Sequence, residues 1–345
     1  MVYAMMSIGV LGFVVWSQEL AFLFSDLEIT NFAICWNSLV LLGTFNSKNP
    51  YFYTWSAGNF IHLWKSSSET TRETSFNFNA FRNLTKCSSS KISDEWLTWF
   101  VGFVEGDGAI LIQKQNKPYF VLTQNEEKVL HDIQETLNIG LVKNFGKFSR
   151  LMAYSNKDID VLISIFNGNL FLSKRKYQLK KWLLAKNITS MNNNLKPSLT
   201  DAWISGFVDA EGCFNATLFK RKAMTLGYQV KMRFMIDQSE SLDEMNALKE
   251  TLNLFLTHRK LKKGAIGKMY RIESNSLKKI PLIIKYFNHF NLKTKKKESF
   301  DKWSNVYNMI LQNKHLLAEG LTEIRLLSKQ INLITSITRR TGNKN

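Results

Sequence analysis

The chain has 345 residues and a formal net charge of +18, with 45% hydrophobic and 21% charged residues. This length and composition are sufficient for two folded domains and exclude an intrinsically disordered chain. Three widely separated cysteines and five unclustered histidines argue against a disulfide framework, a zinc knuckle and a histidine-metal nuclease, and the sequence has no glycine-rich phosphate loop.

The positive charge lies in the last three-quarters of the chain. Residues 1–92 hold six Lys and Arg and five Asp and Glu, so 40 basic and 23 acidic residues remain in 93–345, an excess of +17. Such an excess favours a polyanionic partner, with nucleic acid ahead of an anionic membrane. A basic soluble protein without such a partner is the alternative.

Two apolar runs open the chain, MVYAMMSIGVLGFVVW at 1–16 and NFAICWNSLVLLGTF at 31–45. Each is shorter than the roughly 20 residues of a membrane span, and no basic region precedes the first. Residues 1–17 resemble a transmembrane segment of cytochrome c oxidase subunit I, which continues into a His-His pair where Gln18 and Glu19 stand here. The resemblance implies an exon-derived segment at 1–17 and an intron-encoded extension at 18–92, for which we predict no fold. An inner-membrane protein is a weaker alternative, because the runs are short and the rest of the chain is basic.

Two copies of one unit follow. LTWFVGFVEGDGAI (97–110) matches DAWISGFVDAEGCF (201–214). The match continues between YFVLTQNEEKVLHDIQETLN (119–138) and MRFMIDQSESLDEMNALKETLN (232–253), and between NLFLSKRKYQLKKW (169–182) and FNLKTKKKESFDKW (290–303). These matches predict one domain at 93–185 and a second at 200–345, joined by an Asn-rich, proline-containing linker at 186–199.

Within each copy the pattern is helix, strand, strand, helix, then more strand and helix, which predicts an α+β fold. Apolar and polar residues alternate in YQVKMRF (228–234), as is typical of a half-buried strand. One face of that strand therefore packs, while the other presents cationic and hydrogen-bonding groups. The apolar spacing in 126–138 and 242–253 predicts amphipathic helices that cover the sheets.

The motif segments place small residues four positions apart on one helix face, where they would let two helix backbones approach closely. These residues are Gly102, Gly106, Gly206 and Ala210. Each helix ends at an acid, Asp107 or Glu211, and the next residue, Gly108 or Gly212, is expected to make a left-handed turn into the first strand. Two such helices side by side would bring Asp107 and Glu211 together.

Two adjacent carboxylates repel each other unless a cation lies between them, and the negative ends of two helix dipoles favour the same cation. Hard oxygen ligands suit Mg²⁺, which typically binds one or two carboxylates together with waters and phosphate oxygens. A divalent ion beside cationic strands can activate water and stabilise the leaving 3′ oxygen in phosphodiester hydrolysis. A packed helix that ends in a surface acid would explain one motif equally well, but it does not explain two matching copies.

FVGFVEGDG (100–108) and ISGFVDAEG (204–212) resemble the motif of the LAGLIDADG homing endonucleases in their two-motif, single-chain form, and the likeness covers roughly 93–335. It implies two pseudo-symmetric αββαββα units forming a saddle-shaped antiparallel sheet over double-stranded DNA, with cleavage across the minor groove that leaves short 3′ overhangs. It implies metal binding at Asp107 and Glu211, with Gly106 and Ala210 beside them, and two or three Mg²⁺ ions shared between the acids. Because one acid is Asp and the other Glu, we expect the two strand cuts to be unequal.

The same resemblance points to auxiliary residues. Gln124 and Gln238 match a position, at the end of the second strand, that orders water in the active site; an ordinary polar residue at a strand end is an equal alternative. Lys181 and Lys302 are candidates for a basic residue that assists catalysis, with solvated surface lysines as the alternative.

Polar residues on the strands next to the motifs are the DNA-binding candidates, because Arg and Lys can read guanine and Gln can read adenine, while other cations hold phosphates. In the first copy these are Gln113, Lys114, Gln115 and Lys117, and in the second Lys220, Arg221, Lys222, Gln229, Lys231 and Arg233.

The favoured function is that of a monomeric, mitochondrial, site-specific DNA endonuclease that cuts an oxidase gene lacking the intron, at codons around Ser17. The alternative is an RNA maturase that assists splicing of its own group I intron, alone or together with cleavage. Retained acids in both motifs favour the nuclease.

Overall fold

The computed structural model describes residues 76–85, 92–259, 267–274 and 276–341. The chain divides into Met1–Thr71 and Arg72–Asn345, and all described residues belong to the second unit. The segment predicted to be exon-derived, 1–17, and the extension as far as residue 75 lie outside the described residues.

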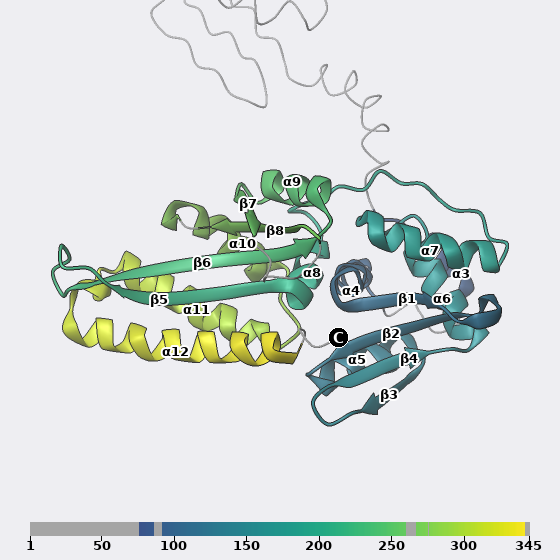
Figure 1. The fold of residues 1–345 in the computed structure, drawn as a ribbon, viewed down its shortest axis with the longest axis horizontal. Coiled ribbons are helices and arrows are strands. Elements are labelled where there is room, and N and C mark those ends of the chain that lie inside the picture. The colour runs from purple at the N-terminus through teal and green to yellow at the C-terminus, as the bar shows by residue number, and fades with distance from the viewer. Residues whose placement is uncertain (1–75, 86–91, 260–266, 275, 342–345) are drawn as a thin grey trace, which may run out of the picture. The chain divides into compact units, whose positions relative to one another are not determined.

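Each sequence copy folds in the predicted order, αββαββα, followed by further helices (Figure 1). The first copy consists of α4 (Asp94–Asp107), β1 (Gly108–Ile112), β2 (Pro118–Gln124), α5 (Glu127–Leu137), β3 (Leu141–Asn144), β4 (Ser149–Ala153), α6 (Asn156–Phe166) and α7 (Ser173–Ala185). The second consists of α8 (Trp203–Glu211), β5 (Gly212–Lys220), β6 (Tyr228–Ser239), α9 (Leu242–Thr251), β7 (Phe255–Arg259), β8 (Met269–Ser274), α10 (Ile280–His289), α11 (Lys296–Leu311) and α12 (Ala318–Thr341).

The strands form two separate four-stranded antiparallel sheets, one in each copy, with the orders β1-β2-β4-β3 and β5-β6-β8-β7. The registers correspond, since Gly108 pairs with Leu122 in the first sheet and Gly212 with Ile236 in the second. The predicted α+β class with two equivalent units is therefore confirmed.

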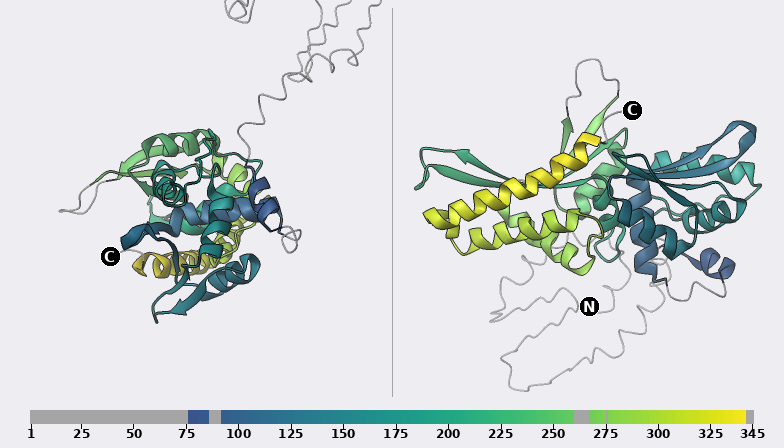
Figure 2. Two further views of the ribbon diagram at one scale, coloured as in Figure 1. Left: turned by 90° about the vertical axis from the view of Figure 1, so that its right-hand side faces the viewer. Right: turned by 90° about the horizontal axis from the view of Figure 1, so that it is seen from below.

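One face of each sheet is packed and the other is open. In β6, Met232 and Phe234 are buried while Lys231 and Arg233 are only half-buried, as the alternating pattern predicts. The amphipathic helices predicted at 126–138 and 242–253 are α5 and α9. In the right-hand view of Figure 2 the strands lie towards one side of the unit and most helices towards the other.

The end of the predicted extension contributes to the first copy. Helix α3 (Asn79–Leu84) packs on α6 through buried Phe81. Asn77 and Asn169 fasten the two segments together, because each donates a hydrogen bond to the other, at 2.8 and 2.7 Å. Between α7 and α8 the chain has neither helix nor strand.

Candidate active site

Helices α4 and α8 lie against each other at the centre of the unit, and glycine sets the distance between them. A Cβ on Gly102 would lie 2.1 Å from the carbonyl oxygen of Trp203, and one on Gly206 would lie 1.8 Å from that of Trp99. A Cβ on Gly106 would lie 2.2 Å from the Cβ of Ala210. The structure thus brings the four predicted small residues to the contact, where Gly102 and Gly206 each meet the backbone of the other helix and Gly106 meets the Cβ of Ala210.

The glycine that follows each motif acid has a different role from the one predicted. Gly108 and Gly212 have φ, ψ of −77°, 155° and −72°, 159°, so both are extended and the predicted left-handed turn is wrong. A Cβ there would lie 2.6 Å from Cγ1 of Val104 or 2.4 Å from Cγ1 of Val208. Glycine is needed because the first strand leaves the helix with no space for a side chain.

Two tryptophans tie the helices together crosswise. The indole Nε1 of Trp99 on α4 donates to Asp209 on α8 at 2.9 Å, and that of Trp203 on α8 donates to Glu105 on α4 at 2.6 Å. All four residues are buried. The pseudo-symmetry of the sequence is therefore repeated in the hydrogen bonds of the interface.

The inner acid of each motif also holds the loop before the late helix. Glu105 accepts hydrogen bonds from the backbone N–H groups of Phe171 and Leu172, at 2.9 and 2.6 Å. Asp209 accepts equivalent bonds from Lys293 and Thr294, at 2.7 and 3.2 Å. Burial raises the pKa of Glu105 to about 7, and these hydrogen bonds oppose the shift. Of the two carboxylates in each motif, the inner one is thus a structural tie.

The outer acids, Asp107 and Glu211, meet where α4 and α8 end. The Cγ atom of Glu211 lies 3.2 Å from the position a Cβ would take on Gly106, the neighbour of Asp107. Burial, and then the charge of Asp107, raise the pKa of Glu211 to about 8. Burial also raises the pKa of Asp107, while Lys296, Gln124 and Arg175 oppose that shift. Burial of both side chains, and the repulsion between them, therefore disfavour the state in which both carboxylates are ionised.

Two cations, buried Arg175 and half-buried Lys296, cap the helix ends beside these acids. Arg175 on α7 donates to the carbonyl oxygens of Glu105 and Gly106, at 2.9 and 2.8 Å. Lys296 on α11 donates to those of Val208 and Ala210, at 3.0 and 2.5 Å. Cations at helix C-termini also offset the negative ends of the dipoles.

Sequence reasoning missed this pair, although the match between SKRK (173–176) and TKKK (294–297) aligns Arg175 with Lys296. The structure places the chosen candidates elsewhere. Lys181 is exposed on α7, with its Nζ 4.7 Å from the ring centre of Tyr177. Lys302 lies on α11, 3.8 Å from the carboxylate of Glu298. Each lies six residues, more than one and a half helical turns, beyond the residue that caps the motif helix.

The two glutamines occupy equivalent strand positions but differ in contact. Nε2 of Gln124 donates to Asp107 at 2.5 Å. Gln238 has the matching register position on β6, opposite Tyr270 of β8, yet among the described residues no hydrogen bond joins it to Glu211. The two halves of the site therefore differ in the hydrogen bond between glutamine and acid as well as in the acid itself, which is Asp107 in one half and Glu211 in the other.

The donor set fits a hard divalent cation. Two carboxylates with raised pKa values converge at the ends of two helices, and a cation there would relieve their repulsion. Within 92–259 and the other described segments, no group of three or more His, Cys, Asp or Glu forms a metal site. An ion held by Asp107 and Glu211 would complete its coordination with water or with substrate oxygens.

The DNA-binding candidates of the first copy lie in a turn and not on strands as predicted. Gln113, Lys114, Gln115 and Lys117 are all exposed between β1 and β2, where Gln115 has a left-handed φ of 67°. In the second copy Lys220 ends β5, Arg221 and Lys222 lie in the exposed turn, and Gln229, Lys231 and Arg233 are on β6.

The open face of the second sheet also carries a charged network that the sequence did not single out. Asp237 on β6 accepts from Arg271 at 2.5 and 2.7 Å and from Arg259 at 2.7 Å. Arg271 lies opposite Asp237 in the β6–β8 register, and Arg259 is on the edge strand β7. Only pairing across strands, which no local pattern reveals, brings these residues together.

One known protein family matches this chain in two segments, one in each copy. Residues 100–185 and 204–307 match the family model described as LAGLIDADG endonuclease. The chain is 35% identical over 288 residues to probable intron-encoded endonuclease 4 of Neurospora crassa, across 80% of this chain and 48% of that protein, so it spans about half of that relative. It is 26% identical to an uncharacterised cox1 intron-2 protein of Schizosaccharomyces pombe, over 78% of this chain and 82% of that one. It is 30% identical to the intron-encoded RNA maturase bI4 of Saccharomyces cerevisiae, over 49% of this chain and 28% of that protein.

Solved structures share the fold. The meganuclease I-SmaMI bound to uncleavable DNA superimposes with a TM-score of 0.57 at 18% identity, covering 69% of this chain and 98% of that one. I-SmaMI bound to an uncleaved target in the presence of calcium ions gives 0.54 at 18% identity, covering 70% and 98%. Among the described helices, none is both long enough and apolar enough to cross a membrane.

Proposed function

Because this chain belongs to the LAGLIDADG endonuclease family, we propose that it is a site-specific endonuclease that cuts both strands of a DNA duplex. The observation that supports this most is the convergence of Asp107 and Glu211 at the ends of two helices held together by glycine contacts. Both motifs lie in one chain, so a monomer has both acids and needs no second copy.

Mg²⁺ is the proposed cofactor, held by the carboxylates of Asp107 and Glu211, with two or three ions shared between them and the oxygens of Gly106 and Ala210 alongside. When bound, such ions supply an activated water and stabilise the leaving 3′ oxygen. Arg175 and Lys296 hold the carbonyl groups next to the acids, and so fix where the acids point. Gln124 orients Asp107, which makes it a positioning residue as well as a candidate for ordering water.

The DNA would lie along the open faces of the two sheets. In the second copy Lys231 and Arg233 project from β6 on the face opposite buried Met232 and Phe234. Exposed turns at the end of each β-hairpin, with Lys114 and Arg221, would reach the outer parts of the target. Phosphate contacts by these cations position the duplex, while base-edge contacts in the grooves give specificity.

The proposed target is an oxidase subunit I gene that lacks the intron, cut near the codons around Ser17, because an intron inserts where its product cuts. Full-length protein incubated with that exon–exon duplex and Mg²⁺ should produce a double-strand break with short 3′ overhangs. The intron-containing gene is the matched control, since the insertion separates the two halves of the target. An intact exon–exon duplex under conditions where the protein binds it would overturn the proposal.

RNA maturation is a second candidate, supported by the similarity to a protein named as an RNA maturase. Rescue of splicing of the host intron by a protein that leaves the exon–exon duplex intact would favour this candidate. Similarity to a cox1 intron protein supports a mitochondrial location.

A further inference from the structure

Residues 161–200 are the longest segment of the described chain that contains no acidic residue. They hold seven Lys and Arg and no Asp or Glu. Arg175 is used at the helix end of α4, and Lys186 pairs with Asp160 at 2.9 Å. The other basic residues are Lys174, Lys176, Lys180, Lys181 and Lys196, of which Lys176 is close enough to Glu244 to favour its ionised form and Lys181 lies over the ring of Tyr177.

The equivalent helix of the second copy is different. On α11, Lys297 pairs with Asp301 and Lys302 lies 3.8 Å from Glu298, so acids within the helix compensate its lysines. Helix α7 has no acid of its own. The uncompensated charge within the helix itself therefore distinguishes α7 from α11, although residues 274–297 of the second copy also hold seven lysines and no acid.

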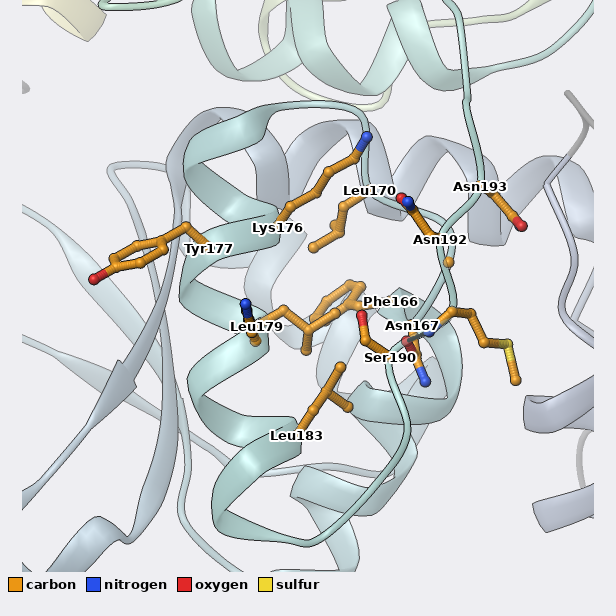
Figure 3. A pocket seen from close by; sticks show the side chains of 13 residues that line it. Phe166, Asn167, Leu170, Lys176, Tyr177, Leu179, Leu183, Ser190, Asn192 and Asn193 are labelled. Carbon is orange, nitrogen blue, oxygen red and sulfur yellow. Dashed lines mark hydrogen bonds between the residues drawn. The ribbon is translucent and has the colours of Figure 1, made fainter.

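A pocket opens between α6, α7 and the linker, and its volume is about 180 Å³. Buried Phe166, Leu170, Leu179 and Leu183 line its apolar part. In Figure 3 Lys176 and Asn192 stand at one end of it, and Tyr177 points outward from α7. A cavity of about 150 Å³ holds one benzene ring, so this pocket can take a single flat ring but not a base pair.

The linker is fastened where it borders the pocket. The side chain of Asn167 donates to the carbonyl oxygen of Thr189 at 3.0 Å and accepts from the N–H of Met191 at 2.9 Å. Within the described residues no hydrogen bond occupies the side chains of Ser190 or Asn192, which also line the pocket. The backbone at the rim is therefore held by Asn167, while the side chains of Ser190 and Asn192 are available to a ligand.

This surface is separate from the open face of the first sheet. Helix α7 packs against β1, and Trp182 on its inner side donates to the carbonyl oxygen of Leu111 at 2.6 Å. Tyr177, 64% exposed, and Lys180 are exposed on α7, whereas Trp182 is buried. No strand residue lines the pocket, so a duplex lying along the open face of the sheet would not occupy it.

We propose that α7 and the linker form a second nucleic-acid site, which binds a single-stranded segment with one unstacked base in the pocket. Lysines beside a recessed apolar pocket match phosphates flanking a base. The Lys181 ammonium lies over one face of the exposed Tyr177 ring, and the other face offers a surface for a neighbouring base to stack on. Amide and hydroxyl groups of Asn192 and Ser190 can bind the base edge. Double-stranded DNA does not fit, because its bases stay stacked and paired. RNA and single-stranded DNA share this chemistry.

The first test measures binding, not cleavage, so it is independent of the proposed nuclease. Full-length protein is titrated into fluorescein-labelled single-stranded RNA of about 16 nucleotides, with single-stranded DNA of the same sequence in parallel. Lys176→Glu/Lys180→Glu should weaken binding at least about tenfold and make the slope of log K against log salt shallower by about 1.4, for two lost phosphate contacts. Lys278→Glu/Lys285→Glu makes the same charge change at exposed lysines of the second copy and should have little effect.

Tighter binding of RNA than of single-stranded DNA would identify RNA as the ligand. Equal affinity would show that the site recognises the phosphates and unstacked bases that both have in common. Both results support the site. The proposed site would be overturned if Lys176→Glu/Lys180→Glu and Lys278→Glu/Lys285→Glu weakened binding of the single-stranded probe equally, or if neither weakened it. Loss of binding to anionic phospholipid vesicles by Lys176→Glu/Lys180→Glu with RNA binding unchanged would also overturn it, because the surface would then serve a membrane.

The pocket itself is tested with RNA that carries 4-thiouridine. Irradiation should crosslink the base to Tyr177, Met191 or their neighbours, as mapped by mass spectrometry, and Ser190→Trp, which fills the pocket, should remove that crosslink. Crosslinks confined to the sheet strands, or unchanged by Ser190→Trp, would refute a base in this pocket.

Discussion

Gly206 is the position where the contact between α4 and α8 is tightest, since an alanine Cβ there would lie 1.8 Å from the carbonyl oxygen of Trp99. Real Cβ contacts are essentially never closer than 3.0 Å, so the helices must separate by the difference, about 1.2 Å. Overpacking of this kind costs about 1–3 kcal/mol. The same movement strains the 2.9 Å hydrogen bond from Trp99 to Asp209, and a bond to a charged group contributes about 1.5–3 kcal/mol.

We therefore expect Gly206→Ala to lower the free energy of unfolding by about 3–5 kcal/mol, measured by urea denaturation followed by tryptophan fluorescence. Gly146→Ala is the matched control. Its added Cβ meets no atom within 4 Å, and only its left-handed φ of 82° adds a cost, about 1–2 kcal/mol. If Gly206→Ala were as stable as Gly146→Ala, the helices would not be held at the backbone contact described.

Three further predictions concern the ends of the motif helices. Burial raises the pKa of Asp201 to about 6, so the folded protein holds this proton more tightly than the unfolded chain, and stability falls as pH rises from about 4 to about 6. Asp201→Asn should remove up to about 3 kcal/mol of that fall, measured by urea unfolding at both ends of the range, and an unchanged pH profile would contradict the assignment. Lys296→Met should slow double-strand cleavage about 100-fold, and Lys296→Arg should retain more activity because Arg175 fills the equivalent place. Lys302→Met is the control, and a loss as large as that of Lys296→Met would show that the cap is not the important cation. Gln124→Leu should slow the cut of one strand more than Gln238→Leu slows the other, because only Gln124 is bonded to its acid among the described residues; equal strand-specific nicking rates would refute this.

The repeat and its helix contact could be predicted from the sequence because glycine spacing and strand alternation are local patterns. Gly102 and Gly206 reach the contact for the steric reason that their spacing suggests. The extended φ of Gly108 could not be foreseen, because a glycine after a helix serves equally for a left-handed turn or for a close approach.

The basic residues show where local patterns stop. Several lysines stand in SKRK and TKKK, and only the docking of α7 and α11 on the motif helices selects Arg175 and Lys296 for the inner side. A choice of Lys181 and Lys302 from the sequence uses only their position along the helix. Which basic residue faces the motif helix depends on how α7 and α11 are rotated about their own axes. The link between Asp237 and Arg271 required the strand register, which a single sequence does not specify.

The central claim is that Asp107 and Glu211 form one metal-dependent site that breaks both strands. The most direct measurement uses supercoiled plasmid with the exon–exon target, incubated with wild type, Asp107→Asn or Glu211→Gln in Mg²⁺ or EDTA, with DNA binding measured alongside in Ca²⁺. Wild type should give linear plasmid in Mg²⁺ and none in EDTA, and each variant should bind the target yet give no linear product. Linear product from either variant, or lost binding in both, would contradict a shared site at the helix ends.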